Sequence, residues 1–238
     1  MFTIITRLPP PPLRVNISPM KNGTGQVAEI YLDARVRILC PPELVPAPGQ
    51  YMLAHAVSSD DPLADPVFFS ESAPDGFRSA PPLPLSWTPG TQLNLRGPLG
   101  HGFSVPVAAR KVALIAFDES PERLRGLIPI AFRQGAEVVL VSDRVAADLP
   151  EAVEVQPLKA FQEVFRWADY AAFDTARENL PRLMKTLDAV NQIEAEVFVR
   201  APMPCGALAE CGICALTIRH GWKMICKDGP VFDLTAIL

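Results

Sequence analysis

The stretches MPCGALAECGIC (residues 203–214) and CKDGPVF (residues 226–232) hold four of the five cysteines of this 238-residue chain. Their spacing is C-x5-C-x2-C-x11-C, and glycines inside the loop let the backbone wrap closely around a small centre. The plant-type [2Fe–2S] rule is C-x4-C-x2-C with a more distant fourth cysteine. Structural zinc more often uses two separate Cys-x2-Cys pairs, and only one such pair is present. The spacing favours a cluster but leaves zinc, or unliganded thiols or a disulfide, as alternatives. The expected ligands are Cys205, Cys211, Cys214 and Cys226.

These two segments resemble the cluster-binding tail of the electron-transfer subunit of class 1B dihydroorotate dehydrogenase. They are also similar to related subunits of sulfide dehydrogenase and of NADH-dependent ferredoxin:NADP oxidoreductase. The ending C-x-D-G-P-V-F is the specific part, because a zinc knuckle has no need of it. A first gap of five residues instead of four, and a short final gap, depart from the family pattern but remove no ligand.

The resemblance implies a [2Fe–2S] cluster bound by the four cysteines and a role in electron transfer. It implies a protein redox partner, such as a dihydroorotate dehydrogenase-like catalytic subunit, within a hetero-oligomer. Through the family it also implies a connection with pyrimidine biosynthesis.

Composition bounds the remaining possibilities. A hydrophobic fraction of 49% is ample for packed cores, and a net charge of −4 gives no reason to expect a nucleic-acid partner. No run of about 18 apolar residues is present, so no membrane span is expected. Residues 1–13 lack the apolar segment of a secretory signal, and the cysteines are clustered rather than scattered. A cytoplasmic protein is therefore expected.

The first hundred residues indicate a small β-barrel. Prolines and glycines separate segments rich in apolar and β-branched residues. The expected strands are residues 26–39, 50–56, 66–70 and 92–96. PGQY (48–51) resembles a turn of the ferredoxin-reductase-like flavin barrel, and GPLGHGF (97–103) resembles the stretch that ends it. Without the cysteine tail, the second stretch reads equally well as a glycine-rich linker. We assign residues 1–103 to this barrel.

After residue 103 the pattern alternates between strands and helices, which predicts a Rossmann-like α/β domain over residues 104–200. A helix is expected to start at Ser120-Pro121, to kink at Pro129 and to stop at Gly135. The other expected helices are residues 158–166 and 175–190. The expected strands are residues 112–117, 138–142, 153–155, 170–173 and 197–200. Residues 201–238 then form the cysteine-rich iron–sulfur tail, so the fold class is β plus α/β.

The cofactor motifs of that family are degraded. Its barrel carries an Arg-Pro-[FLY]-Ser motif whose arginine holds the flavin pyrophosphate, whereas here Asp65 stands at the arginine position. A Gly-Thr pair that meets the flavin has no clear counterpart in the shortened segment 72–89. The expected glycine-rich nucleotide loop reads FDESPE (117–122), with no glycine and three carboxylates. The late Cys-Gly-Pro motif becomes FDT (173–175). The sequence therefore predicts that NAD(P) does not bind, and it weighs against FAD.

No catalytic residue is predicted, since none of the histidines, His55, His101 and His220, has a Ser or Cys partner in a known motif. Cys40, which follows an apolar run, is interpreted as a small buried residue. Charged groups near the tail either offset the charge of a tetrathiolate centre or form an ordinary solvated face. These are Arg219, His220, Lys223 and Lys227.

The resulting hypothesis is an electron-transfer subunit with one [2Fe–2S] cluster. Two alternatives are kept, a reductase subunit that retains FAD and a non-enzymatic structural or regulatory protein with a four-cysteine zinc site.

Overall fold

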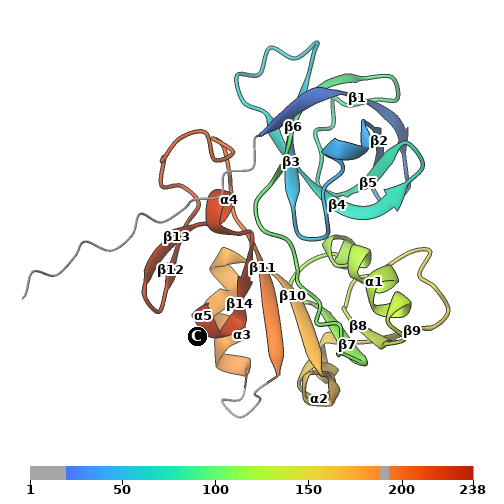
Figure 1. Cartoon of the computed structure of the whole chain (residues 1–238), viewed down its shortest axis with the longest axis vertical. Helices are drawn as coiled ribbons and strands as arrows, with labels where there is room; N and C mark the ends of the chain where they lie inside the picture. The colour runs from blue at the N-terminus through green and yellow to red at the C-terminus, as the bar shows by residue number, and fades with distance from the viewer. Residues whose placement is uncertain (1–19, 188–192, 238) are drawn as a thin grey trace, which may run out of the picture.

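The computed structural model describes residues 20–187 and 193–237. Its first part is a closed barrel with the strand order β1-β2-β5-β4-β3-β6, all neighbours antiparallel (Figure 1). Inward and outward side chains alternate along strands such as β6, as expected of a sheet with one buried face. The strands are β1 (Lys21–Ile30), β2 (Val36–Leu39), β3 (Tyr51–Ala56), β4 (Asp65–Ala73), β5 (Gly76–Ala80) and β6 (Gln92–Leu99).

The barrel was predicted with its strands only partly right. The segment 26–39 is a hairpin rather than one strand, because the chain reverses at Ala34, which has a φ of 63°. The Asp33 carboxylate accepts the Arg35 N–H at 3.1 Å and stabilises this turn. Strand β5 was not predicted, since its residues lie in the Pro-rich segment 72–89, to which the sequence analysis assigned no strand.

The second part is a parallel sheet with one antiparallel edge strand, in the order β14-β11-β10-β7-β8-β9. The order reverses between β7 and β10, which makes their carboxyl ends the switch point where such folds bind ligands. The parallel strands are β7 (Lys111–Ala116), β8 (Glu137–Val141), β9 (Val153–Gln156), β10 (Tyr170–Ala176) and β11 (Glu194–Arg200). Helix α1 (Ile128–Arg133) packs on one face, and α2 (Phe161–Trp167) and α3 (Leu180–Thr186) pack on the other.

The helices are shorter than predicted. In place of one kinked helix from Ser120 to Gly135, two 3₁₀ turns, Pro121–Arg123 and Arg125–Leu127, precede α1. Pro129 lies in the first turn of α1, where its missing N–H costs nothing, so it causes no kink. The helix expected at 175–190 begins only at Leu180, because β10 continues to Ala176, and residues 188–190 lie outside the described residues.

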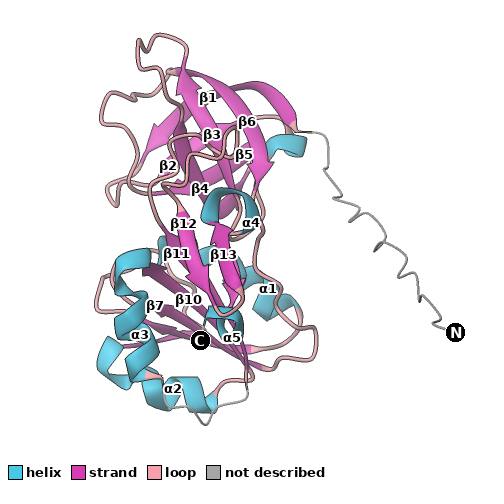
Figure 2. Ribbon diagram, turned by 90° about the vertical axis from the view of Figure 1, so that its left-hand side faces the viewer, coloured by secondary structure: helices cyan, strands magenta, loops and turns pink. Residues whose placement is uncertain are grey.

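The cysteine tail lies at the junction of the barrel and the sheet (Figures 1 and 2). It contains a hairpin of β12 (Ala215–Ile218) and β13 (Gly221–Met224), then α4 (Ile225–Asp228), β14 (Val231–Asp233) and α5 (Leu234–Ile237). Strand β14 joins the sheet beside β11, and one hydrophobic cluster includes residues of the barrel, the sheet and the tail. The boundaries at 103/104 and 200/201 stay predictions.

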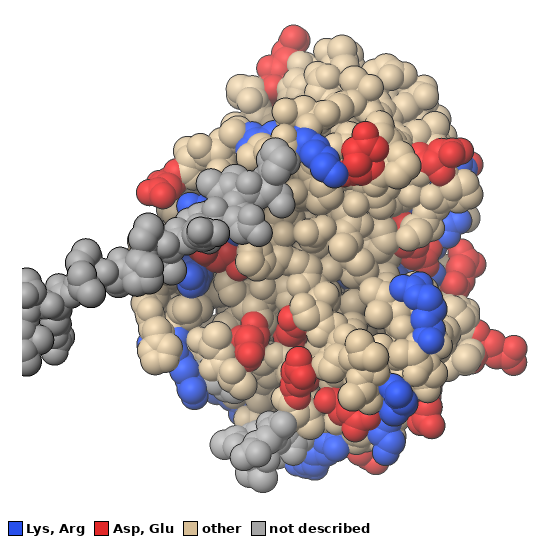
Figure 3. Space-filling view, in the orientation of Figure 1, with Lys and Arg blue, Asp and Glu red and all other residues tan. Residues whose placement is uncertain are grey.

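The described part of the chain, 20–187 and 193–237, contains no helix that is both long and apolar enough to cross a bilayer. On the face in Figure 3, acidic and basic side chains are interspersed among uncharged ones. The sign of the charge on this face therefore does not by itself specify a partner.

Candidate metal centre

The fold brings the four predicted cysteines together in two pairs. The Sγ atoms of Cys205 and Cys211 lie 3.5 Å apart, and those of Cys214 and Cys226 lie 3.2 Å apart. The first three residues come from the loop after β11, and α4 supplies the fourth. The first and second cysteines of the motif form one pair, and the third and fourth form the other.

The two-by-two arrangement bears on the kind of centre. Two thiolates on one tetrahedral ion, with metal–sulfur distances of about 2.3 Å, lie about 3.7 Å apart. Each pair is close to that separation. In the described residues, however, no three His, Cys, Asp or Glu side chains gather closely enough to hold one ion. Each pair alone therefore has the spacing of two thiolates on one ion.

The two pairs differ in exposure and in acidity. Cys211 is exposed and Cys205 half-buried, whereas Cys214 and Cys226 are buried. Burial and the neighbouring Cys214 thiol raise the pKa of Cys226 to about 12. Burial also acts to raise the pKa of Cys205, but backbone N–H groups, led by that of Ala209, outweigh it and lower the pKa. A metal must therefore displace a tightly held proton at Cys226.

The barrel holds the tail from one side. The hydroxyl of Tyr51, on β3, is fully buried and donates to the Cys226 carbonyl at 2.7 Å. The His101 N–H donates to the Gly229 carbonyl at 2.6 Å. A Cβ on Gly100, which has a φ of +75°, would lie 2.5 Å from that same carbonyl oxygen. Both barrel motifs, PGQY and GPLGHGF, thus contact the cysteine tail. The second motif begins within strand β6, so it is part of the barrel as well as the link to the sheet.

The sheet holds the tail from the other side. Arg177 follows β10, and its Nη1 donates to the carbonyls of Ile213 at 2.6 Å and Ala215 at 3.2 Å. These two carbonyls flank Cys214. Sequence reasoning missed Arg177, because nothing in one sequence connects a residue after a strand with a loop 36 residues away.

The charged residues predicted beside the tail are dispersed. Lys223 and Lys227 line a groove of about 380 Å³ together with Cys226. Lys223 lies 3.6 Å from Asp228, so part of its charge is offset within the groove. His220 is exposed at the hairpin turn. Trp222 forms the groove's apolar wall and is 65% exposed, which places it at the rim rather than in the core.

The strand that would carry a flavin motif provides no free guanidinium in this chain. Burial and the nearby Asp61 carboxylate raise the pKa of Asp65. Farther along β4, Glu71 pairs with three arginines at 2.6 to 2.9 Å, namely Arg35, Arg78 and Arg125.

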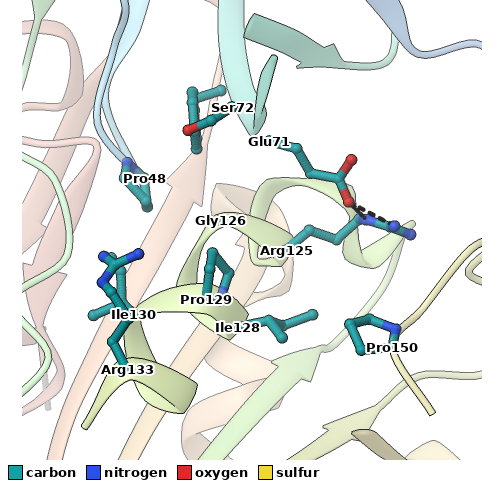
Figure 4. Close-up of a pocket in the computed structure, with 11 residues that line it drawn as sticks. Pro48, Glu71, Ser72, Arg125, Gly126, Ile128, Pro129, Ile130, Arg133 and Pro150 are labelled. Carbon is teal, nitrogen blue, oxygen red and sulfur yellow. Dashed lines mark hydrogen bonds and ion pairs between the residues drawn. The ribbon is translucent and has the colours of Figure 1, made fainter. Parts of the chain in front are cut away.

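Arg125 belongs to the segment that leads into α1, and it lines a cavity of about 400 Å³ between this segment and β4 (Figure 4). Its remaining donors reach the carbonyls of Ala147 and Asp148. Every guanidinium nitrogen of the buried Arg35 and Arg125 therefore already contacts an oxygen of the chain, which disfavours a pyrophosphate at this wall of the cavity.

The crevice at the switch point is occupied by a carboxylate of the chain itself. Asp118 follows β7 and accepts hydrogen bonds from the Ala176 N–H at 2.8 Å, the Thr175 hydroxyl at 2.9 Å and the Asn179 amide at 2.7 Å. Arg200 also pairs with Asp118, and its Nε donates to Asp174 at 2.7 Å. The donors at the end of β10 are thus already used by Asp118, and the pocket of about 460 Å³ beside it is lined by the carboxylates of Asp118, Glu119 and Asp143 as well as by Arg144 and Arg182. The three carboxylates would repel a dinucleotide phosphate.

Within residues 20–187 and 193–237, no hydrogen bond joins a histidine side chain to a serine or cysteine side chain. A ring nitrogen of His55 lies 2.7 Å from the Asp61 carbonyl oxygen, and His101 is exposed and forms an isolated β-bridge with Pro230. Cys40 is 8% exposed in the barrel core, away from the tail cysteines.

Comparison with known proteins agrees with this arrangement. Residues 201–238 match the family model described as the iron–sulfur cluster binding domain of dihydroorotate dehydrogenase B. This match confirms the resemblance of the tail to that iron–sulfur binding domain.

Solved structures show that the fold is ferredoxin-reductase-like, as the sequence predicted. A chain of the NADH-dependent reduced ferredoxin-NADP oxidoreductase, studied for flavin-based electron bifurcation, aligns with a TM-score of 0.69 and 15% identity. The alignment covers 90% of this chain and 89% of that one. The ferredoxin reductase in carbazole 1,9a-dioxygenase aligns with a TM-score of 0.56 and 17% identity, over 71% of this chain and 65% of that one. At these identities the likeness concerns the fold alone.

Proposed function

We propose that this chain is an electron-transfer subunit with one [2Fe–2S] cluster on Cys205, Cys211, Cys214 and Cys226. When bound, the cluster supplies one-electron chemistry, and the chain holds and insulates it. The subunit passes electrons between a protein redox partner and an acceptor within a hetero-oligomer. A dihydroorotate dehydrogenase-like catalytic subunit is the partner that the tail suggests, and it would place the chain in pyrimidine synthesis in the cytoplasm.

The pairing of the sulfurs supports this proposal most directly. Separations of 3.5 and 3.2 Å within the pairs fit two ions that share the four thiolates evenly. The inner pair is buried and the outer pair reaches the surface at Cys211. A partner could therefore approach the centre most closely on the side of Cys211.

The proposal includes neither flavin nor pyridine nucleotide. Support comes from the arginines committed to Glu71 and from the Asp118 carboxylate, which stands where a phosphate would bind. A chain without these cofactors cannot accept a hydride, so its donor must deliver single electrons.

A subunit that retains FAD is the second candidate, because the fold is shared with ferredoxin reductases. Anaerobic reductive titration with dithionite separates it from the first. The proposal predicts uptake of about one electron per chain, whereas a flavin plus a cluster would take up about three. Uptake of no electrons by folded protein would contradict both and would favour the zinc alternative.

A further inference from the structure

Arg177 is a charged contact between the sheet and the cysteine loop. It lies in the 3₁₀ turn directly after β10, and its side chain is 30% exposed. Its second nitrogen is 3.5 Å from the exposed Glu178 carboxylate, a separation that leaves this ion pair weak. The stronger contacts are those to the loop, at 2.6 and 3.2 Å.

These contacts fix how the peptide groups around Cys214 are oriented. A trans peptide is planar, with its C=O and N–H pointing in opposite directions. Because the Ile213 carbonyl points toward Arg177, the Cys214 N–H points to the opposite side of the chain. Hydrogen bonds from backbone N–H groups to cluster sulfurs, together with local charge, are known to set the reduction potential.

We infer that Arg177 is a positioning residue that sets the reduction potential of the centre; this inference depends on the proposed function. Its guanidinium holds the two carbonyls that flank Cys214, which directs the Cys214 N–H to the other side of the chain. It also places a permanent positive charge beside a centre that becomes more negative when it is reduced. Both effects favour the reduced state, so Arg177 raises the potential.

The test compares holoproteins carrying Arg177→Gln, Arg177→Lys and, as a matched control, Arg182→Gln. Arg182 lies five residues farther along, over the Phe117 ring at 5.3 Å, and no described hydrogen bond joins it to the tail. We expect Arg177→Gln to shift the midpoint potential to more negative values and to change the electron paramagnetic resonance spectrum of the reduced cluster. Arg177→Lys should shift the midpoint potential in the same direction but by less, while Arg182→Gln should have the midpoint potential of the wild type.

The outcomes separate the inference from the proposed function. Wild-type protein without iron would refute both. Iron-containing Arg177→Gln with an unchanged potential and spectrum would overturn the inference alone. If Arg177→Gln folds but binds no iron, Arg177→Lys decides: a shifted potential or spectrum supports the inference, and values equal to wild type overturn it.

Discussion

At the residue scale, the centre is asymmetric. Cys226 is buried, accepts a hydrogen bond from Tyr51 at its carbonyl and has a pKa raised to about 12, whereas Cys211 is exposed. A buried thiol binds metal only by losing its proton, so binding at Cys226 must offset the cost of removing that proton.

Replacing one cysteine of either pair should remove the centre. We expect Cys226→Ser and Cys211→Ser each to lower bound iron at least about fivefold, because a two-ion centre needs all four thiolates. Cys40→Ala is the matched control, since it removes a buried cysteine of the barrel core and should leave the iron content unchanged. Iron analysis after anaerobic purification measures both. Full iron occupancy in Cys226→Ser would show that this residue is not a ligand.

At the element scale, close contacts at two barrel glycines hold the tail in addition to the side chains of Tyr51 and Arg177. Gly49 and Gly100 bring barrel turns against Val231 and Gly229 of the tail, at separations that a Cβ would not allow. Glycine at such positions is required both by the positive φ and by the space. The sequence displayed these glycines, but it could not show that their partner was the tail.

The contact at Gly100 can be tested against a glycine of similar conformation. Gly135 has a φ of +72°, close to the +75° of Gly100, but no atom lies within 4 Å of its added Cβ. Gly135→Ala should lower the unfolding temperature by about 2–4 °C through backbone strain alone. Gly100→Ala should lower it at least about twice as far and should also reduce iron content. Equal effects of the two substitutions in thermal unfolding would contradict this docking.

The contact between β4 and the segment before α1 predicts a dependence on pH. Burial acts to raise the pKa of Glu71, but Arg78, Arg125 and Arg35 outweigh it and hold the pKa below its usual value of 4.5. A lowered pKa stabilises the fold above the unfolded pKa, and this stabilisation is lost as the pH falls through the folded value. Glu122 beside it has a raised pKa, caused mainly by burial, and opposes this trend.

Glu71→Gln isolates the contribution of Glu71 because Glu122 is present in both proteins. We expect the variant to be less stable by about 2 kcal/mol at pH 7, with a smaller difference from wild type near pH 4. Thermal unfolding of both apo-proteins at the two pH values measures this, since acid loss of a cluster then plays no part. A difference that stays constant with pH would rule out the assignment.

At the scale of the whole molecule, the sequence predicted the order of barrel, α/β sheet and cysteine tail. Continuous apolar strands such as β7 and the cysteine spacing are patterns within short stretches of the chain, so they could be recognised in the sequence. The lengths of the helices were not predicted. Each helix has only about two turns, because a proline lies near its start or because the preceding strand or turn extends farther than expected. The networks around Glu71 and Asp118 join residues more than 50 positions apart, and no single-sequence pattern encodes them.

The absence of glycine after β7 predicted a lost nucleotide site, and the structure supplies a physical account of the change. Asp118 uses its carboxylate to accept donors from the end of β10, and Arg200 links it to Asp174. These contacts join the ends of β7, β10 and β11. On the flavin side of the molecule, Asp65 lies at the start of β4, before Glu71. The identity of Asp65 alone therefore did not predict the cluster of arginines around Glu71.

The most direct test of the account is an ultraviolet–visible spectrum of anaerobically purified protein before and after dithionite, with iron, acid-labile sulfide and flavin measured on the same sample. The account predicts broad visible bands that bleach on reduction, about two irons and two sulfides per chain, and no flavin. Colourless protein that contains zinc, or bands of bound flavin beside those of the cluster, would contradict it.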